Sequence, residues 1–342
     1  MSSEQHQENK ANVWAFWEAL DGAEQADAAA IASSACAADM VWHGPAPIGD
    51  LHGIDAWLAD FWLPFRSSFT NLRRETFLFF GGESNGRRDG DLSKDGAAWV
   101  TGTGVLRATF TNDWLGIPAT GAEVTIRWGD FSRMVDGTIS EVFFLVDIID
   151  LMAQAGVSVL PPERGQPHVY PPPAAADGIQ RGEASAEQTR YSLDHIRGFI
   201  FDGLNAFDQD DLASMGMADW FHPEVRWYGP GGIGACLSFQ EFEDLHQAPW
   251  LVAFPDRQVQ DLDALFAEGV YTGAPGWAGV TARHTGEYLG VAATDNPIQF
   301  NGLDWWKRDG ERYVENWVFV DMVHLFEQFG VDLFQRMRDQ LS

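Results

Sequence analysis

The segment WHGPAPIGDLHG (residues 42–53) decides the fold, because its pattern returns later in the chain as WYGPGGIG (residues 227–234). The offset between the two is 185 residues, and the same offset relates Pro64 to Pro249. A period this long indicates a duplicated domain rather than a solenoid of short repeats. We therefore expect two copies of one domain.

Further matches extend the repeat to the end of each copy, at an offset of 174 residues. They relate Gly116 to Gly290, Asp130 to Asp304, Glu141 to Glu315, Asp147 to Asp321 and Gly156 to Gly330. The offset changes because the first copy has a longer loop between residues 81 and 96. We expect domain 1 over residues 8–160, a Pro- and Ala-rich linker over 161–188 and domain 2 over 189–342.

Each copy shows the same order of predicted elements. Apolar residues at helical spacing come first, and they are Val13, Phe16, Trp17 and Leu20 in one copy and Ile196, Phe199, Ile200 and Leu204 in the other. A short strand, a helix, three long strands and a short helix that ends at a glycine follow. Asp136-Gly137 and Asp309-Gly310 predict a hairpin between the last two strands. Helices followed by a run of strands predict an α+β fold.

The composition excludes several classes of function. The 342 residues include 22 Lys and Arg against 50 Asp and Glu, a formal net charge of −28. Nucleic acids and anionic membranes require clustered basic residues, so we expect neither as a partner. We expect a cytoplasmic protein, because the chain has only two cysteines, no apolar run long enough to span a membrane and a polar N-terminus without a secretory signal.

Several segments of both copies resemble the SnoaL-like polyketide cyclase branch of the nuclear-transport-factor-2-like superfamily. The segments are WHGPAPIGDLHG, FWLPFRSSF, DWLGIPATG, GDFSRMVDGTISE and VDIIDLMAQAG in the first copy, and WYGPGGIG, HTGEYLGVAAT, LDWWKRDGERYVENWVFVD and MVHLFEQFG in the second. The resemblance implies a cone-shaped α+β domain, with a curved antiparallel sheet packed on helices around an apolar pocket. It also implies a small hydrophobic ligand and no cofactor. Family members dimerise through the sheet, so we expect an internal pseudo-dimer or a homodimer.

The reaction that the resemblance implies is an aldol cyclisation, which needs a base beside a carbonyl and a donor for the enolate oxygen. Asp130 and its equivalent Asp304 are our candidates for the base, because each shares a strand face with apolar residues. Burial raises the pKa of such a carboxyl group toward the working pH. The alternative is that Asp130 bonds an Arg or Trp across the cone and only shapes the pocket.

His284 is the third catalytic candidate, because we expect it on the strand opposite Asp304. The two side chains would then form a His–Asp pair that acts as the general base. The equivalent residue in the first copy is Phe110, so the pair is possible in one copy only. A satisfied core histidine is the alternative. We also expect a set of pocket side chains to contact the ligand, and these are Trp42, His43, Trp62, Arg66, Trp128, Trp227, Tyr228 and Trp306.

Two recurring pairs of acids favour structural roles. Glu141 and Glu315 lie in the last strand of each copy, where we expect a salt bridge to an Arg on the neighbouring strand. Asp147 and Asp321 directly precede the closing helix, where an aspartate side chain caps free N–H groups.

One departure from the family pattern weakens the prediction of catalysis. The resemblance implies a His-x-Asp-like base in the last strand, but the positions there are Val142 and Phe144, and Asn316 and Val318 in the second copy. The chain also lacks zinc-ligand spacing, a P-loop and a complete dinucleotide motif. Two functions remain: a cofactor-independent cyclase- or isomerase-like enzyme acting on a hydrophobic or aromatic carbonyl compound, or a non-catalytic binding protein with the same pocket.

Overall fold

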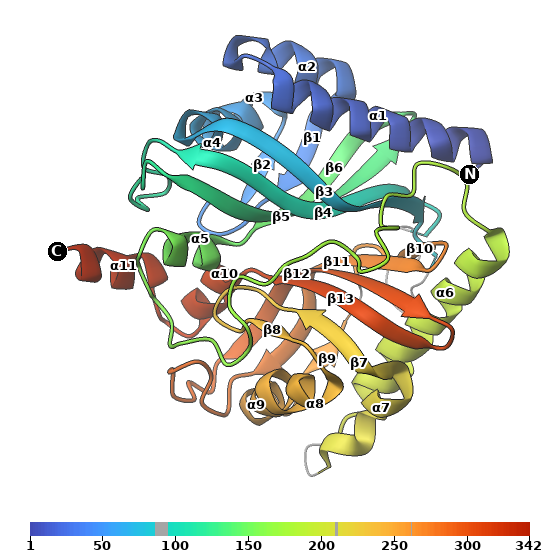
Figure 1. Cartoon of the computed structure of the whole chain (residues 1–342), viewed down its shortest axis with the longest axis vertical. Helices are drawn as coiled ribbons and strands as arrows, with labels where there is room; N and C mark the ends of the chain where they lie inside the picture. Colours follow the sequence, from blue (N-terminus) through green and yellow to red (C-terminus); the bar gives the residue numbers. More distant parts are fainter. Residues whose placement is uncertain (86–94, 209–210, 261) are drawn as a thin grey trace. The chain divides into compact units, whose positions relative to one another are not determined.

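The computed structural model describes residues 1–85, 95–208, 211–260 and 262–342, so most of the longer loop expected between residues 81 and 96 lies outside it. The chain divides into two compact units (Figure 1). Unit 1 comprises Met1–Glu83, Gly96–Val157 and Pro171–Glu183, and unit 2 comprises Ser84–Asp95, Ser158–Tyr170 and Ala184–Ser342. The Pro-rich segment between the two sheets thus contributes residues to both units.

Most helices of unit 1 cover one face of its sheet, and the closing helix α5 (Ile148–Gln154) lies apart from them (Figure 1). In α1 (Ser3–Gly22) the side chains of Val13, Trp17 and Leu20 are buried, because their spacing places them on one face of the helix. The remaining helices are η1 (Gln25–Asp27), α2 (Ala28–Ala35), α3 (Ile54–Trp57), η2 (Leu58–Trp62), α4 (Leu63–Ser68) and α5 (Ile148–Gln154). The turn η2 is π-helical and continues directly from α3 into α4.

The sheet of unit 1 has six strands in the order β2-β1-β6-β5-β4-β3. The strands are β1 (Cys36–His43), β2 (Asp50–His52), β3 (Phe69–Glu83), β4 (Ala98–Phe110), β5 (Glu123–Val135) and β6 (Thr138–Val146). Neighbours are antiparallel except β1 and β6, which are parallel. The parallel pair is a correction to the expected antiparallel sheet, and it arises because a long crossover rather than a hairpin connects the two strands.

A fourth long strand, β3, is a further correction, because the sequence predicts only three in each copy. The first half of β3 alternates poorly between buried and exposed residues, so its period-2 signal is weak. Pairing with β4 over most of its length holds it in the sheet.

Unit 2 repeats this order of elements. Its helices are α6 (Ala186–Gly198), η4 (Phe199–Gly203), η5 (Leu204–Ala206), η6 (Leu212–Met215), α7 (Met217–Trp220), α8 (Phe239–Glu241), η7 (Phe242–Gln247), α9 (Ala248–Ala253), α10 (Met322–Gln328) and α11 (Leu333–Leu341). Its strands are β7 (Phe221–Tyr228), β8 (Ala235–Cys236), β9 (Gln258–Val259), β10 (Phe266–Glu268), β11 (Tyr271–Arg283), β12 (Pro297–Asp309) and β13 (Arg312–Val320). The expected α+β class is therefore confirmed. Among the described residues, no helix is long and apolar enough to cross a membrane.

The sheet of unit 2 has the order β10-β11-β12-β13-β7-β8, with β9 paired to β11. The pair β7 and β13 is parallel, as β1 and β6 are in unit 1. The expected hairpins are present in both units, and their turns follow Val135 and Asp309. Asp136 and Gly137 both have positive φ angles (50° and 78°), which is the geometry of the type I′ turn that Asp-Gly favours.

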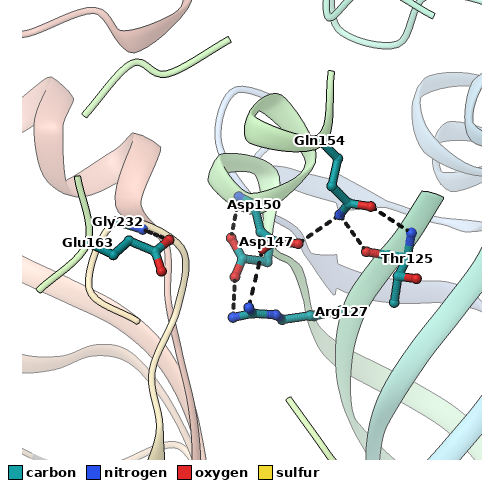
Figure 2. A network of polar contacts seen from close by, with 7 residues as sticks. All are labelled: Thr125, Arg127, Asp147, Asp150, Gln154, Glu163 and Gly232. Atoms are coloured by element: carbon teal, nitrogen blue, oxygen red, sulfur yellow. Dashed lines mark hydrogen bonds and ion pairs between the residues drawn. The ribbon is translucent and has the colours of Figure 1, made fainter. Parts of the chain in front are cut away.

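The closing helix is fastened to the sheet in the same way in both units. In unit 1 the Gln154 side chain accepts from Thr125 N (2.9 Å) and donates to Thr125 O (2.8 Å), as Figure 2 shows. In unit 2 Gln328 makes the same two bonds with Gln299, each of 2.8 Å. Both positions obey the 174-residue offset, so the two helices share a side-chain clamp as well as a topology.

Candidate functional site

A cavity of about 200 Å³ lies in unit 2 between the helical layer and the sheet. Helical turns η4 and η7 and helix α9 form one wall, and strands β11, β12 and β13 form the other. Most of the lining is aromatic or aliphatic, including Phe199, Ile200, Phe221, Trp227, Phe242, Trp250, Phe300, Trp306 and Val318. The polar lining residues are His246, Gln247, Arg257 and Asp304. Such a cavity, apolar with a few polar groups, is typical of small-molecule sites.

Interruptions of the sheet keep this cavity open. The register between β11 and β12 shifts between Gly276 and Val280, and Ala278 there has a φ of 57°. A Cβ atom on Gly276 would lie 3.1 Å from Gly279 Cα, so the two backbones approach too closely for larger residues. Both glycines line the cavity. The bulge is therefore part of the cavity wall, as bulges beside binding sites often are.

Asp304 borders the cavity from the middle of β12. Its backbone is paired with Ala274 on β11 and Val318 on β13. Asn316 Nδ2 donates to Asp304 Oδ1 over 3.3 Å. Burial raises the pKa of Asp304 to about 7, against the smaller opposing effect of the Asn316 bond. A carboxyl group with this pKa exchanges protons readily near neutral pH.

His246 and Gln247 face the cavity from the π-helical turn η7. The imidazole ring stacks on Trp227 with ring centroids 4.0 Å apart. Burial, and then the positive charge of Arg257, lowers the pKa of His246 to about 3, so the ring is neutral. The neighbouring amide of Gln247 is 5% exposed, and neither of its polar atoms has a hydrogen-bond partner in the described chain. π-Helical turns occur frequently at functional sites.

Arg257 lies in the cavity wall just before β9. Its Nη1 donates to Leu204 O over 3.0 Å, and its Nη2 contacts the sulfur of Met215. Burial lowers the pKa of Arg257 to about 10, so the guanidinium still carries its charge at neutral pH.

The corresponding cavity of unit 1 measures only about 40 Å³. Asp130 lines it and accepts a hydrogen bond from Ser132 Oγ over 2.6 Å. Burial raises the pKa of Asp130 to about 7, although the Ser132 bond and the charge of Arg74 act in the opposite direction. Arg74 is itself held by Asp21 through two bonds of 2.8 and 3.1 Å.

Larger side chains account for the smaller volume in unit 1. At the 185-residue offset Phe61 corresponds to His246 and Trp62 to Gln247, and at the 174-residue offset Phe144 corresponds to Val318. In the first helical stripe Trp17 takes the place that Ile200 has in unit 2. All of these residues line their respective cavities. The aromatic rings of unit 1 thus occupy space that is free in unit 2.

The predicted His–Asp pair between His284 and Asp304 does not form. Asp304 is opposite Ala274, whereas His284 follows Arg283, which is opposite Pro297 near the far end of the same strand pair. The His284 ring is fully buried, bonds Thr294 Oγ1 through Nδ1 (3.1 Å) and stacks on Phe329 at 3.9 Å. The prediction that His284 lies opposite Asp304 is therefore wrong. The order of elements in the sequence predicts which strands are neighbours, but it does not predict their register.

The predicted ligand contacts divide into two groups. Trp42 and Trp62 line the cavity of unit 1, and Trp227 and Trp306 line that of unit 2. The lining of these cavities does not include Trp128, which packs against Trp17 and Arg74, or Arg66, whose guanidinium lies 5.9 Å from the Trp62 ring.

His43 and Tyr228 are also absent from the cavity linings and bond to charged neighbours instead. His43 Nδ1 lies 2.9 Å from Asp50 Oδ1, and its Nε2 lies 3.3 Å from Glu141 Oε1. The hydroxyl of Tyr228 has hydrogen bonds with Arg226 and Glu315. Both residues thus complete polar networks of β1 and β7 and leave the cavity walls to other side chains.

The recurring acids outside the cavities have structural contacts. Glu141 pairs with Arg133 on the neighbouring strand at 3.4 Å, as expected. Glu315 also pairs across to the neighbouring strand, but its partner is Lys307 at 3.8 Å and not the expected Arg. Asp147 Oδ1 accepts from Asp150 N (3.0 Å), and Asp321 Oδ1 accepts from His324 N (3.1 Å). Both aspartates therefore cap the closing helices.

In unit 1 this cap belongs to a buried ionic cluster, drawn in Figure 2. The guanidinium of Arg127 lies 3.2 Å from both Asp147 and Asp150. Unit 2 has Asn301 and His324 at the positions of Arg127 and Asp150, so of these three charged residues only the capping aspartate, Asp321, has a charged counterpart there. Figure 2 also shows Glu163 accepting from Gly232 N over 2.9 Å, which holds part of the Pro-rich segment against the loop after β7 in unit 2.

The sequence analysis missed His246, Gln247 and Arg257. A signal for all three was present in the 185-residue offset, which aligns them with Phe61, Trp62 and Leu72. Polar residues that replace apolar ones at equivalent core positions indicate a different use of the space around them. Among the described residues, no group of His, Cys, Asp and Glu is arranged to hold a metal ion.

Part of unit 2 matches a known protein family. Residues 205–329 match the family described as SnoaL-like polyketide cyclase. No curated protein matches the chain.

Several solved structures are similar to part of the chain. AclR, a candidate hydroxylase of Streptomyces galilaeus, is 22% identical over 42% of this chain and 97% of its own, with a TM-score of 0.34. A candidate SnoaL-like polyketide cyclase of a Jannaschia species is 14% identical over 44% and 99% of the two chains, with a TM-score of 0.37. IdmH, a candidate polyketide cyclase of Streptomyces antibioticus, is 21% identical over 41% and 99%, with a TM-score of 0.32. Over residues 205–329, which include His246, Arg257 and Asp304, the chain is thus similar to the SnoaL-like polyketide cyclase family.

Proposed function

We propose that both units are SnoaL-like domains that arose by tandem duplication, and that unit 2 is a cofactor-independent acid–base enzyme acting on an apolar carbonyl compound. One observation carries the proposal: the Asp304 carboxyl group borders an apolar cavity of about 200 Å³, and burial raises its pKa to about 7. A base with a pKa near the working pH combines a useful deprotonated fraction with a useful driving force for proton removal.

The chemistry follows from the polar groups of the cavity. Ionised Asp304 removes a proton from the carbon beside the substrate carbonyl, and the electron pair of that C–H bond moves onto the carbonyl oxygen to give an enolate. The neutral His246 ring offers an N–H donor to an oxygen that gains negative charge. The enolate carbon then attacks a second carbonyl of the substrate, and the alkoxide that forms takes the proton from Asp304. In an isomerisation, a conjugated enolate instead takes that proton from Asp304 at a different carbon.

Unit 1 is proposed to stabilise the chain without turning over substrate. Its carboxyl group, Asp130, has a similarly raised pKa, but aromatic rings fill the space beside it. A substrate would have to displace Trp17 or Trp62, both of which are at most 5% exposed.

A non-catalytic binding protein is the alternative function. It is favoured by Asn316 and Val318, which stand in the last strand where the family pattern has its own base. Asn316 donates to Asp304 and so holds the carboxylate that would replace that base.

Exchange of the α-protons of 1-tetralone in D₂O, followed by proton NMR, tests the proposal without knowledge of the natural substrate. We expect the chain to accelerate the exchange, and Asp304→Asn to reduce the acceleration by about 10²- to 10⁴-fold. The matched variant Asp130→Asn should retain it. An unchanged rate in Asp304→Asn would overturn the assignment, and 1-tetralone binding by calorimetry without exchange would support the binding protein instead.

A further inference from the structure

Arg257 is a buried cation that lacks a carboxylate partner among the described residues. It is 7% exposed, and its polar contacts are the carbonyl of Leu204 and the sulfur of Met215. The guanidinium also lies 5.3 Å from the centroid of the Phe207 ring. These contacts use only part of its five N–H donors. A buried charge is normally paired, so an unpaired one that lines a cavity indicates a partner from outside the chain.

Two arginines of unit 1 show the usual pairing of a cation with a carboxylate. Arg74, which lines the smaller cavity, makes a bidentate pair with Asp21. Arg127 lies 3.2 Å from each of two buried aspartates. At the position of Arg257, unit 1 has the apolar Leu72. A cation at this position is therefore specific to the unit with the larger cavity, and no acid among the described residues is paired with it.

A second, independent group points to the same ligand chemistry. The Gln247 side chain is 5% exposed and lines the cavity, and both its Nε2 and its Oε1 lack hydrogen-bond partners in the described chain. An unsatisfied buried amide costs free energy that a bound ligand would recover. A planar carboxylate accepts two parallel N–H bonds from a guanidinium and can accept another from an amide.

We propose that the cavity of unit 2 binds aromatic carboxylates, with the ligand carboxylate on Arg257 and Gln247 and its ring system among the aromatic side chains. This inference rests on the proposed function in that it names the substrate class of the same cavity. The carboxylate anchors one end of the substrate, and Asp304 on β12 meets the carbonyl-bearing part.

Calorimetric titration of the full chain with naphthalene-2-carboxylate and with naphthalene-2-carboxamide tests the proposal. The two probes have the same ring system and differ in charge at about pH 8, where the acid is ionised. We expect the carboxylate to bind at least about tenfold more tightly, because a desolvated charge pair with Arg257 forms only with the anion. Equal affinity, or tighter binding of the carboxamide, would overturn it.

Variants then assign the preference to Arg257. Arg257→Met should abolish the preference for the carboxylate, and Arg257→Lys should retain part of it as a point charge. Arg283→Met removes an exposed arginine of the same unit and should leave the preference unchanged. If Arg257→Met does not fold, the wild-type probe pair and Arg257→Lys still decide. A preference that survives in Arg257→Met would place the carboxylate elsewhere.

Asp304→Asn separates this inference from the proposed function. It should abolish the exchange of 1-tetralone protons while naphthalene-2-carboxylate still binds in preference to the carboxamide. Loss of exchange without any carboxylate preference contradicts only the inference about the ligand. A carboxylate preference with exchange unaffected by Asp304→Asn contradicts only the proposed catalysis.

Discussion

The two units share strand order, hairpins and closing-helix clamps, yet unit 1 fills the space between its helices and sheet while unit 2 leaves about 200 Å³ of it open. The linings of the two cavities differ at four equivalent positions. Unit 1 has Trp17, Phe61, Trp62 and Phe144 where unit 2 has Ile200, His246, Gln247 and Val318. The same arrangement of helices and strands can therefore hold either a nearly filled core or an open cavity between its helices and its sheet.

The placement of charge follows the same division. In unit 1 the cations Arg74 and Arg127 are paired with aspartates. In unit 2 Arg257 lines a cavity and has no carboxylate partner among the described residues. Asp304 lines the same cavity, and its hydrogen-bond partner is the neutral Asn316. Neutralised charges contribute to a fixed fold, whereas uncompensated ones are available to a ligand.

The largest expected effect comes from making unit 2 resemble unit 1. Gln247→Trp introduces the ring that Trp62 supplies in unit 1 and should reduce the exchange of 1-tetralone protons by about 10²-fold or more, because the ring occupies the cavity. The reciprocal variant Trp62→Gln should leave exchange unchanged and destabilise the chain by about 3 kcal/mol, measured by urea denaturation. Exchange that survives in Gln247→Trp would show that the cavity is not the reaction site.

The next largest effect concerns the buried ions of unit 1. Arg127→Met leaves Asp147 and Asp150 buried without their cation and should lower the free energy of unfolding by about 3–5 kcal/mol. The matched change in unit 2 is Asn301→Ala, which removes one neutral acceptor of the Ala278 N–H and should cost only about 1 kcal/mol. Equal losses in the two variants would mean that the ionic cluster contributes no more than its neutral counterpart.

A pH effect of intermediate size should be common to both units. Burial raises the pKa of both Asp130 and Asp304 from 3.8 to about 7, so the unfolded chain loses these protons at lower pH than the folded chain. The stability that each protonated carboxyl group contributes is therefore complete below about pH 4 and is lost as the pH rises toward 7. Asp304→Asn should be as stable as the wild type at about pH 4 and more stable at about pH 8, by up to roughly 4 kcal/mol.

Thermal unfolding of Asp304→Asn and Asp130→Asn across that pH range measures this effect. A smaller gain in Asp130→Asn would indicate that the charge of Arg74 offsets part of the burial in unit 1. A stability difference that does not change with pH would show that neither carboxyl group has a raised pKa.

The smallest effects test what the two units have in common. Gln154→Ala and Gln328→Ala each remove one side chain that makes two bonds to the backbone of a neighbouring strand. Each should lower the free energy of unfolding by about 1 kcal/mol. Hydrogen exchange at the backbone amides of Thr125 and Gln299 should accelerate in the corresponding variant alone. Unequal losses would indicate that the two closing helices depend on different contacts.

The sequence by itself determined the α+β class, the repeated order of elements and the closing-helix caps, because helical spacing, Asp-Gly turns and aspartates before helices are local signals. It also selected Asp130 and Asp304, since a carboxylate on an apolar strand face is visible as a period-2 pattern. Whether these two residues are catalytic stays a prediction.

The tertiary structure decided what no local pattern contains. Strand register separated His284 from Asp304, and long crossovers made β1 parallel to β6 and β7 parallel to β13. The volume of each cavity depends on how side chains from several helical segments and strands fill one space, which only their assembled positions fix. For the same reason the sequence did not reveal Arg257 and Gln247 as candidate ligand contacts. Whether a charged or amide side chain has a partner depends on all the groups that surround it in the fold.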